Sequence, residues 1–182
     1  MGMSLGGLIA QIASIKYPQR ISALILLSTG TWGDSDPQTP EMDQRVVEFQ
    51  QKAEKVNWQK EQQVVNYLLE GAWLMSGDKP LDEKKYRSYL VAEYERASNY
   101  KFMYNHAQLS GGEQYWNKLD HIHSPVLIIH GTKDHIWDFK HAAFLSSKLR
   151  KSDLLPLAGT GHELHPLDYQ KIASSPVFSN TV

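Results

Sequence analysis

Three widely separated residues have the types and the order that nucleophilic catalysis by a serine requires. Ser4 lies in Gly2-Met3-Ser4-Leu5-Gly6, Asp134 follows an apolar run, and His162 ends a glycine-rich segment of the 182-residue chain. A serine hydroxyl is a poor nucleophile at neutral pH, so it needs a nearby base, and the base needs an acid that fixes its tautomer. The order Ser, Asp, His predicts Ser4 as nucleophile, Asp134 as acid and His162 as general base.

The pattern Gly-x-Ser-x-Gly around Ser4 is typical of a sharp turn from a strand into a helix. Glycine is expected on both sides of the serine, at Gly2 and Gly6, because the chains crowd together at such a turn. The amide of Leu5, directly after the nucleophile, is predicted to donate to the oxyanion. The competing interpretation is that Ser4 is only a helix N-cap.

The acid and the base have rivals elsewhere in the chain. Asp138 and Asp153 lie beside predicted helix and strand starts, and Asp134 itself has a competing interpretation as a turn residue. His165 precedes a proline, which suits the start of a helix, and His130 ends a predicted strand. These positions make Asp134 and His162 the favoured pair.

Apolar runs predict the elements that position these residues. A helix from Leu5 to Tyr17 precedes a strand at 21–27, and a second strand follows at 126–130, each strand apolar enough to be buried on both faces. Helix, tight turn and buried strand together predict an α/β fold with a parallel sheet. Asp134 would then lie at the carboxyl end of a strand, where such sheets bind ligands. No strand is expected before Ser4, because too few residues precede it.

The segment between the two strands is helical and charged on its surface. We therefore predict a partial α/β core of residues 1–30 and 124–182 and a helical cap of residues 31–123. Core packing is the default role of aromatic residues in such a cap. An apolar substrate is weakly favoured, and the side chains predicted to bind it are Trp32, Trp73, Tyr104 and Trp116.

The composition excludes several classes of function. A net charge of -1 gives no basic field for nucleic acid. The chain has no apolar run that could span a bilayer and no signal-peptide pattern at its start, so no membrane partner and a cytoplasmic location are expected. Without cysteine there are no disulfides or thiolate metal sites, and His121-x-His123 has no further ligands nearby, so no metal is predicted.

Four segments carry a resemblance to a known family: Gly2-Met3-Ser4-Leu5-Gly6-Gly7-Leu8-Ile9-Ala10-Gln11, Tyr17-Pro18-Gln19-Arg20-Ile21, Val126-Leu127-Ile128-Ile129-His130-Gly131-Thr132-Lys133-Asp134 and Gly159-Thr160-Gly161-His162. They resemble the α/β-hydrolase superfamily, and within it the small capped esterases, lipases and methylesterases. The resemblance implies a Ser4-Asp134-His162 triad, an acyl-enzyme intermediate, a small-molecule ester substrate and no cofactor.

Members of that superfamily carry several strands before the nucleophile, and those strands are missing here. The resemblance therefore implies the C-terminal portion of an α/β-hydrolase fold. It also leaves open a catalytically inactive fragment that acts by binding or by pairing with another chain. A homodimer formed through an uncovered sheet edge would be one such pairing.

Overall fold

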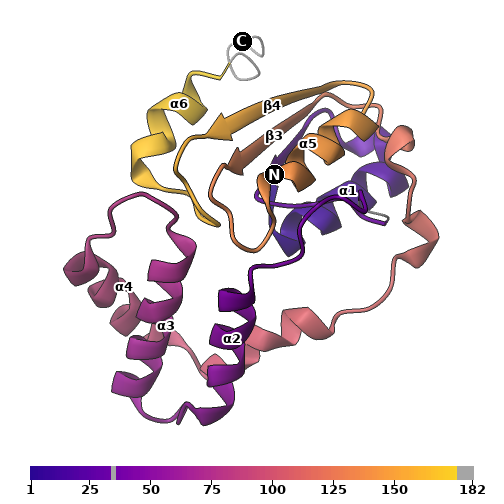
Figure 1. The fold of residues 1–182 in the computed structure, drawn as a ribbon. Coiled ribbons are helices and arrows are strands. Elements are labelled where there is room, and N and C mark those ends of the chain that lie inside the picture. Colours follow the sequence, from indigo (N-terminus) through magenta and orange to yellow (C-terminus); the bar gives the residue numbers. More distant parts are fainter. Residues whose placement is uncertain (34–35, 176–182) are drawn as a thin grey trace.

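A parallel sheet covered by helices forms one part of the molecule (Figure 1). The computed structural model describes residues 1–33 and 36–175. Within these ranges the sheet has four strands in sequence order: β1 (Gly2–Met3), β2 (Leu24–Leu27), β3 (Val126–Gly131) and β4 (Ser152–Leu157). All neighbouring strands run parallel, which confirms the predicted α/β fold.

The structure corrects two expectations about the strands. Two residues before Ser4 are enough for the short strand β1, which pairs with β2 through Gly2 and Leu26. The strand predicted at 21–27 begins only at Leu24, because Leu24 pairs with Val126, the first residue of β3, and residues 21–23 have no partner in that strand.

Helices cover both faces of the sheet. Helices α1 (Leu5–Lys16) and α5 (Phe139–Lys148) pack on one face, where Leu26 and Ile128 are fully buried. On the other face, Ile172 of the short helix α6 (Tyr169–Ala173) packs against the side chains of Leu27, Leu127, Ile129 and Leu157. This double cover explains why β2 and β3 are continuous apolar runs.

The helices between β2 and β3 form a separate block beside the sheet (Figure 1). This block contains α2 (Gln44–Lys52), α3 (Glu61–Met75) and α4 (Glu83–Arg96), with 3-10 segments at Ala53–Lys55, Tyr100–Gln108, Glu113–Tyr115 and Leu119–His121. All of these elements fall within the predicted cap, residues 31–123, whose boundaries remain a prediction. None of the helices in the described part of the chain has the length and apolarity needed to cross a bilayer.

A buried glutamine fixes the chain where it leaves the sheet for the cap. Gln11 is fully buried on α1. Its Nε2 donates to the carbonyl of Gly30 (2.8 Å), and its Oε1 accepts from the amide of Trp32 (2.9 Å). One side chain therefore satisfies two backbone groups that the loop itself leaves without a strand or helix partner.

We expect Gln11→Met to lower the free energy of unfolding by about 2–4 kcal/mol, because two backbone groups would lose their partner. Urea unfolding followed by circular dichroism would measure the change. The matched control is Gln62→Met on the exposed surface of α3, which should stay within about 0.5 kcal/mol of the wild type. Equal values for the two variants would contradict this role of Gln11.

Candidate active site

Ser4 lies in a strained turn between β1 and α1. Its backbone has φ 51° and ψ −123°, a conformation that a residue with a side chain adopts only when its surroundings enforce it. Here the Ser4 amide donates to the carbonyl of Leu27 (3.0 Å), and its carbonyl accepts from the amide of Gly7 (2.8 Å) and the hydroxyl of Thr29 (2.9 Å). Ser4 occupies the N-cap position of α1, but its side chain makes no capping hydrogen bond.

The glycines around Ser4 are not equivalent. A Cβ atom at Gly2 would lie 2.1 Å from the carbonyl oxygen of Gly6, and one at Gly7 would lie 2.5 Å from Thr29. A Cβ atom at Gly6 would meet nothing within 4 Å beyond its chain neighbours and the backbone of its own helix. The expectation that crowding requires glycine at both Gly2 and Gly6 is therefore wrong for Gly6, and the crowded neighbour on the helix side is Gly7.

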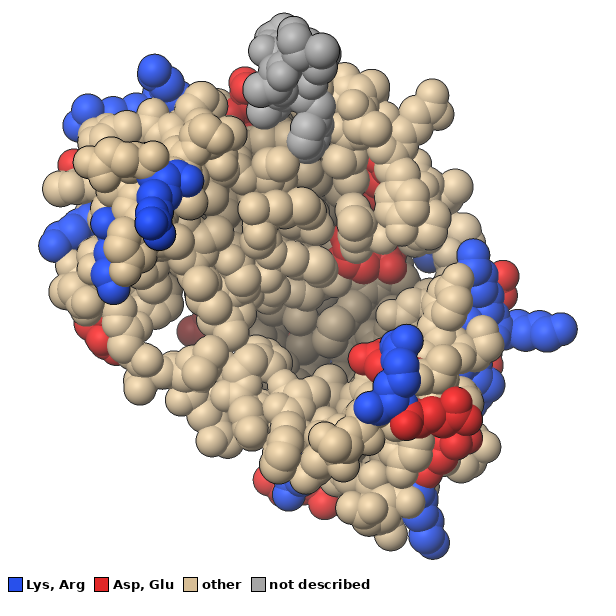
Figure 2. Space-filling model, turned by 180° about the vertical axis from the view of Figure 1, so that it is seen from behind, with Lys and Arg blue, Asp and Glu red and all other residues tan. Residues whose placement is uncertain are grey.

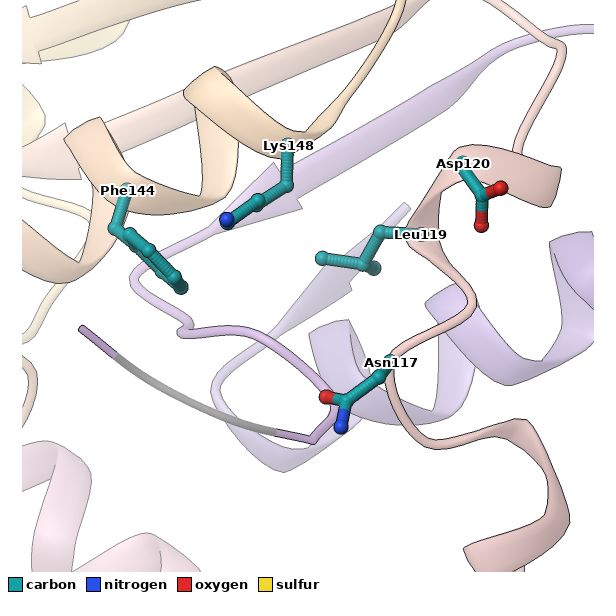
Figure 3. Close-up of a pocket in the computed structure, with 5 residues that line it drawn as sticks. All are labelled: Asn117, Leu119, Asp120, Phe144 and Lys148. Carbon is teal, nitrogen blue, oxygen red and sulfur yellow. The ribbon is translucent and has the colours of Figure 1, made fainter.

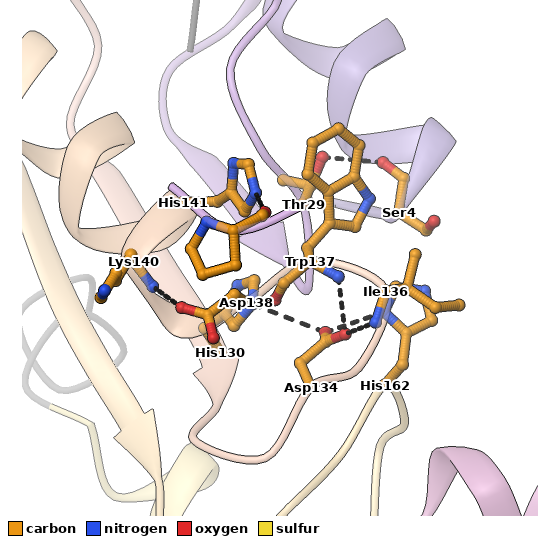
Figure 4. A network of polar contacts seen from close by, with 11 residues as sticks. Ser4, Thr29, His130, Asp134, Ile136, Trp137, Asp138, Lys140, His141 and His162 are labelled. Atoms are coloured by element: carbon orange, nitrogen blue, oxygen red, sulfur yellow. Dashed lines mark hydrogen bonds and ion pairs between the residues drawn. The ribbon is translucent and has the colours of Figure 1, made fainter. Parts of the chain in front are cut away.

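Asp134 and His162 are joined by a buried hydrogen bond (Figure 4). His162 Nδ1 donates to Asp134 Oδ2 over 2.8 Å, and the two side chains are 8% and 0% exposed. The other carboxylate oxygen, Oδ1, accepts from the amides of Ile136 (2.8 Å) and Trp137 (2.9 Å). These amides fix the carboxylate, which in turn selects the His162 tautomer with its proton on Nδ1.

The surroundings of Asp134 keep it ionised. Burial raises the pKa of this carboxyl, but the hydrogen bond and charge of His162, the Trp137 amide and His130 together lower the pKa below its ordinary value. An ionised Asp134 stabilises a positive charge on the His162 imidazole, which is what a general base needs when it takes up a proton.

His130 supports this carboxylate from inside the sheet. Its ring is fully buried, with Nε2 2.7 Å from the carbonyl of Trp137 and 3.5 Å from Asp134 Oδ2. Burial lowers the pKa of His130, and because its Nε2 contacts a carbonyl oxygen, this nitrogen carries a proton and donates it to Trp137. The sequence indicated only a partly buried residue at the end of a strand.

The rival acids and base have other roles. Asp138 caps α5 by accepting from the amide of Lys140 (2.9 Å), and Asp153 lies exposed on β4. His165 caps the 3-10 segment Pro166–Asp168 and contacts the carbonyl of Pro80 (3.1 Å). None of these three forms the contact that joins Asp134 to His162.

Ser4 and His162 line the same open cavity, which has a volume of about 730 Å³. Leu5, the predicted oxyanion donor, also lines it. In Figure 4 the Ser4 side chain and the His162 ring lie on the same side of Asp134. The structure therefore brings all four predicted catalytic residues to one place: Ser4, Leu5, Asp134 and His162.

The cavity wall is mainly apolar. It combines core residues and cap residues, among them Leu8, Phe49, Met75, Met103, Tyr104, Ile136, Trp137 and His141. Seen from behind, the molecule is hollowed, and lysine and arginine side chains gather toward its outer margins (Figure 2). The sequence did not indicate Trp137 or His141, although Trp137 lies only three residues after Asp134.

The four aromatic residues predicted to bind substrate lie in different places. Tyr104 lines the cavity and shares a hydrogen bond with the hydroxyl of Tyr67. Trp32 and Trp116 pack edge to face, with ring centroids 6.0 Å apart, and Trp73 is half exposed on α3. Among the described residues, these three tryptophans do not belong to the wall of this cavity.

Two further cavities lie outside this one. A cavity of about 950 Å³ lies between α4 and the segment after His162, and it shares His162 with the first. A smaller cavity of about 290 Å³ lies between α5 and residues 117–120, with Lys148 and Asp120 in its wall (Figure 3). The described residues contain no group of three histidine, aspartate or glutamate side chains that could hold a metal ion.

The sequence places the chain in a family. Residues 1–169 match the family described as the alpha/beta hydrolase fold, and the chain belongs to it. No curated protein sequence matches the chain.

Solved structures of similar fold include two esterases and a meta-cleavage product hydrolase. An esterase from Exiguobacterium antarcticum has a TM-score of 0.69 and 21% identity, over 97% of this chain and 63% of the esterase. An esterase from Rhodococcus sp. has a TM-score of 0.70 and 17% identity, over 95% of this chain and 61% of that esterase. A meta-cleavage product hydrolase from Pseudomonas fluorescens has a TM-score of 0.59 and 15% identity, over 94% of this chain and 58% of that hydrolase. The chain thus spans less than two thirds of each of these proteins.

The lowered pKa of Asp134 predicts a pH-dependent stability. The folded state lowers this pKa, so the ionised Asp134 stabilises the fold. This stabilisation is complete above the ordinary pKa of 3.8 and is lost as the pH falls through the pKa of the folded state. The difference in unfolding free energy between the wild type and Asp134→Asn should therefore be largest near neutral pH and shrink as the pH falls below about 4. Urea unfolding at several pH values would measure it, and a difference independent of pH would contradict the assignment.

Proposed function

We propose that this chain is a serine hydrolase that acts on carboxylic esters through Ser4, Asp134 and His162. The observation that carries the proposal is the buried His162–Asp134 hydrogen bond at the wall of the cavity that Ser4 also lines. Membership of the alpha/beta hydrolase fold family supports it, as does the occurrence of esterases among the proteins of similar fold.

In the proposed reaction the Ser4 hydroxyl attacks the ester carbonyl carbon. His162 Nε2 takes up the hydroxyl proton, because Nδ1 is already bound to Asp134. The tetrahedral intermediate then expels the alcohol, which receives that proton from His162, and Ser4 is left acylated. A water molecule, deprotonated by His162, attacks the acyl group and releases the acid and the free Ser4 hydroxyl. No cofactor enters these steps.

The Leu5 amide is proposed to stabilise the negative oxygen of the tetrahedral intermediate. Leu5 is the first residue of α1, where helix amides have no intrahelical acceptor and the helix dipole is positive. Removing one such donor in other enzymes lowers turnover by about a hundredfold to a thousandfold. Because the donor is a backbone amide, the side chain at this position does not need to be polar, which is consistent with a leucine here.

The substrate is proposed to be a small apolar ester. The cavity volume of about 730 Å³ falls in the range of small-molecule sites. The apolar side chains of Leu8, Phe49 and Met103 suit a hydrocarbon or aromatic group. Tyr104 remains a proposed substrate contact; the tryptophans Trp32, Trp73 and Trp116 would need to contact a substrate from outside this cavity.

The proposal predicts that the purified chain hydrolyses p-nitrophenyl acetate and that Ser4→Ala reduces the rate to the background of the buffer. The matched control is Ser147→Ala, an exposed serine on α5 whose hydroxyl bonds the carbonyl of Phe144; it should keep the wild-type rate. Absorbance of released p-nitrophenol would measure all three rates.

The second candidate is a catalytically inactive chain that acts by binding. Strand β1 favours it, because among the described strands β1 pairs only with β2 and leaves its other edge open. Equal hydrolysis by the wild type and Ser4→Ala would support this second candidate and would rule out the serine hydrolase.

A further inference from the structure

The cap segment between α3 and α4 runs against the loop that carries His162. Gly77 and Thr160 form an antiparallel bridge, and the amide of Asp78 donates to the carbonyl of Gly159 (2.8 Å). The amide of His162 itself donates to the carbonyl of Met75 (2.9 Å). The cap backbone thus holds the residue proposed as the general base.

The two backbones are in direct contact. A Cβ atom at Gly161 would lie 2.0 Å from the carbonyl oxygen of Met75, and one at Gly77 would lie 2.6 Å from the carbonyl oxygen of Gly159. Gly131, at the end of β3, approaches the other side of the loop, where an added Cβ would lie 2.2 Å from the carbonyl oxygen of Thr160. The loop is therefore enclosed between the sheet and the cap segment, and it has little room to shift.

A buried ion pair joins the cap segment to the 3-10 segment Pro166–Asp168, which follows the loop of His162. Lys79 Nζ lies 2.5 Å from Asp168 Oδ1, and the two side chains are only 14% and 6% exposed. The second carboxylate oxygen, Oδ2, accepts from the hydroxyl of Thr160 (2.6 Å), which is fully buried. Asp168 therefore links a lysine of the cap segment to the loop of His162.

Thr160 also reaches the acid of the proposed triad. Its carbonyl accepts from the amide of Lys133 (2.9 Å), the residue directly before Asp134. Two residues after Thr160, the His162 ring meets the Asp134 carboxylate. Thr160 therefore contacts Asp168 through its side chain and the residue next to Asp134 through its backbone.

We propose that Lys79 and Asp168 are positioning residues for His162: through the hydroxyl of Thr160 they hold the imidazole against Asp134 and tie its position to the cap. Neither side chain lines the cavity that holds Ser4, so neither is a catalytic residue. The contribution to turnover rests on the proposed hydrolase function, whereas the effect on the His162 ring does not.

A charged pair is suited to linking the cap segment and the His162 loop, because each charge depends on the other. A buried ion pair is stable only when both charges are present and their remaining hydrogen-bonding groups are satisfied. Loss of either partner leaves the other charge buried and unpaired, and the segment must then move to reach water. That movement would carry Thr160 and His162 with it.

The first test is nitrogen-15 NMR of the histidine rings, with the His162 signals assigned by their loss in His162→Gln. In the wild type we expect a single tautomer with its proton on Nδ1. In Lys79→Met and Asp168→Asn we expect shifted Nδ1 and Nε2 signals that report a mixture of tautomers. Lys79→Arg, which keeps the charge and the donors, should retain the wild-type signals.

Two further variants make the test decisive. Thr160→Val removes only the hydroxyl that receives the Asp168 contact, so it tests the link even if the charge variants fail to fold. Lys52→Met breaks an exposed lysine–glutamate pair with Glu70 inside the cap and should leave the His162 signals unchanged. Wild-type His162 signals in Lys79→Met, Asp168→Asn and Thr160→Val would overturn the proposal.

Ester hydrolysis by the same proteins separates this proposal from the proposed function. If the wild type is active, Asp168→Asn should lower kcat by up to about a hundredfold while KM changes little, because a small misplacement of a catalytic group acts on the chemical step. If the wild type is inactive but the ring signals shift as expected, the hydrolase proposal fails and the positioning role stands. Unshifted signals overturn the positioning role in either case.

Discussion

The hydrogen bond between His162 and Asp134 is the contact on which the candidate active site depends. It joins the ends of two parallel strands, because Asp134 follows β3 and His162 lies in the loop after β4. Several neighbouring groups hold one of these two side chains. The amides of Ile136 and Trp137 fix the carboxylate, and the cap segment fixes the loop of the imidazole. Ser4 is fixed independently, by the strained turn between β1 and α1.

Much of this arrangement could be predicted from the sequence, because it follows from local patterns. The apolar run at 126–130 predicted β3. Because parallel sheets bind ligands at the carboxyl ends of their strands, it also predicted that Asp134 lies at the site. A glycine-rich segment before His162 indicated a loop whose small residues let the imidazole reach across. In each case a few adjacent residues carry enough information, since strand burial and glycine-rich loops leave a local pattern in the sequence.

The remainder depends on contacts between distant segments, which no local pattern records. Periodicity identified apolar residues in the cap, but it could not show that Tyr104 faces the cavity while Trp73 is half exposed. The bond of Gln11 to the loop at 30–32 and the pair of Lys79 with Asp168 join residues far apart in sequence. The steric role of each glycine is equally invisible, and Gly6 is open where Gly7 is crowded.

The central claim is that His162, oriented by Asp134, activates the hydroxyl of Ser4. The most direct measurement is covalent labelling of the purified chain with an alkyl fluorophosphonate, followed by mass spectrometry of the peptide that contains Ser4. We predict one adduct per chain on Ser4, formed much more slowly in His162→Gln. Absence of the adduct in the wild type, or equal labelling rates in the two proteins, would contradict it.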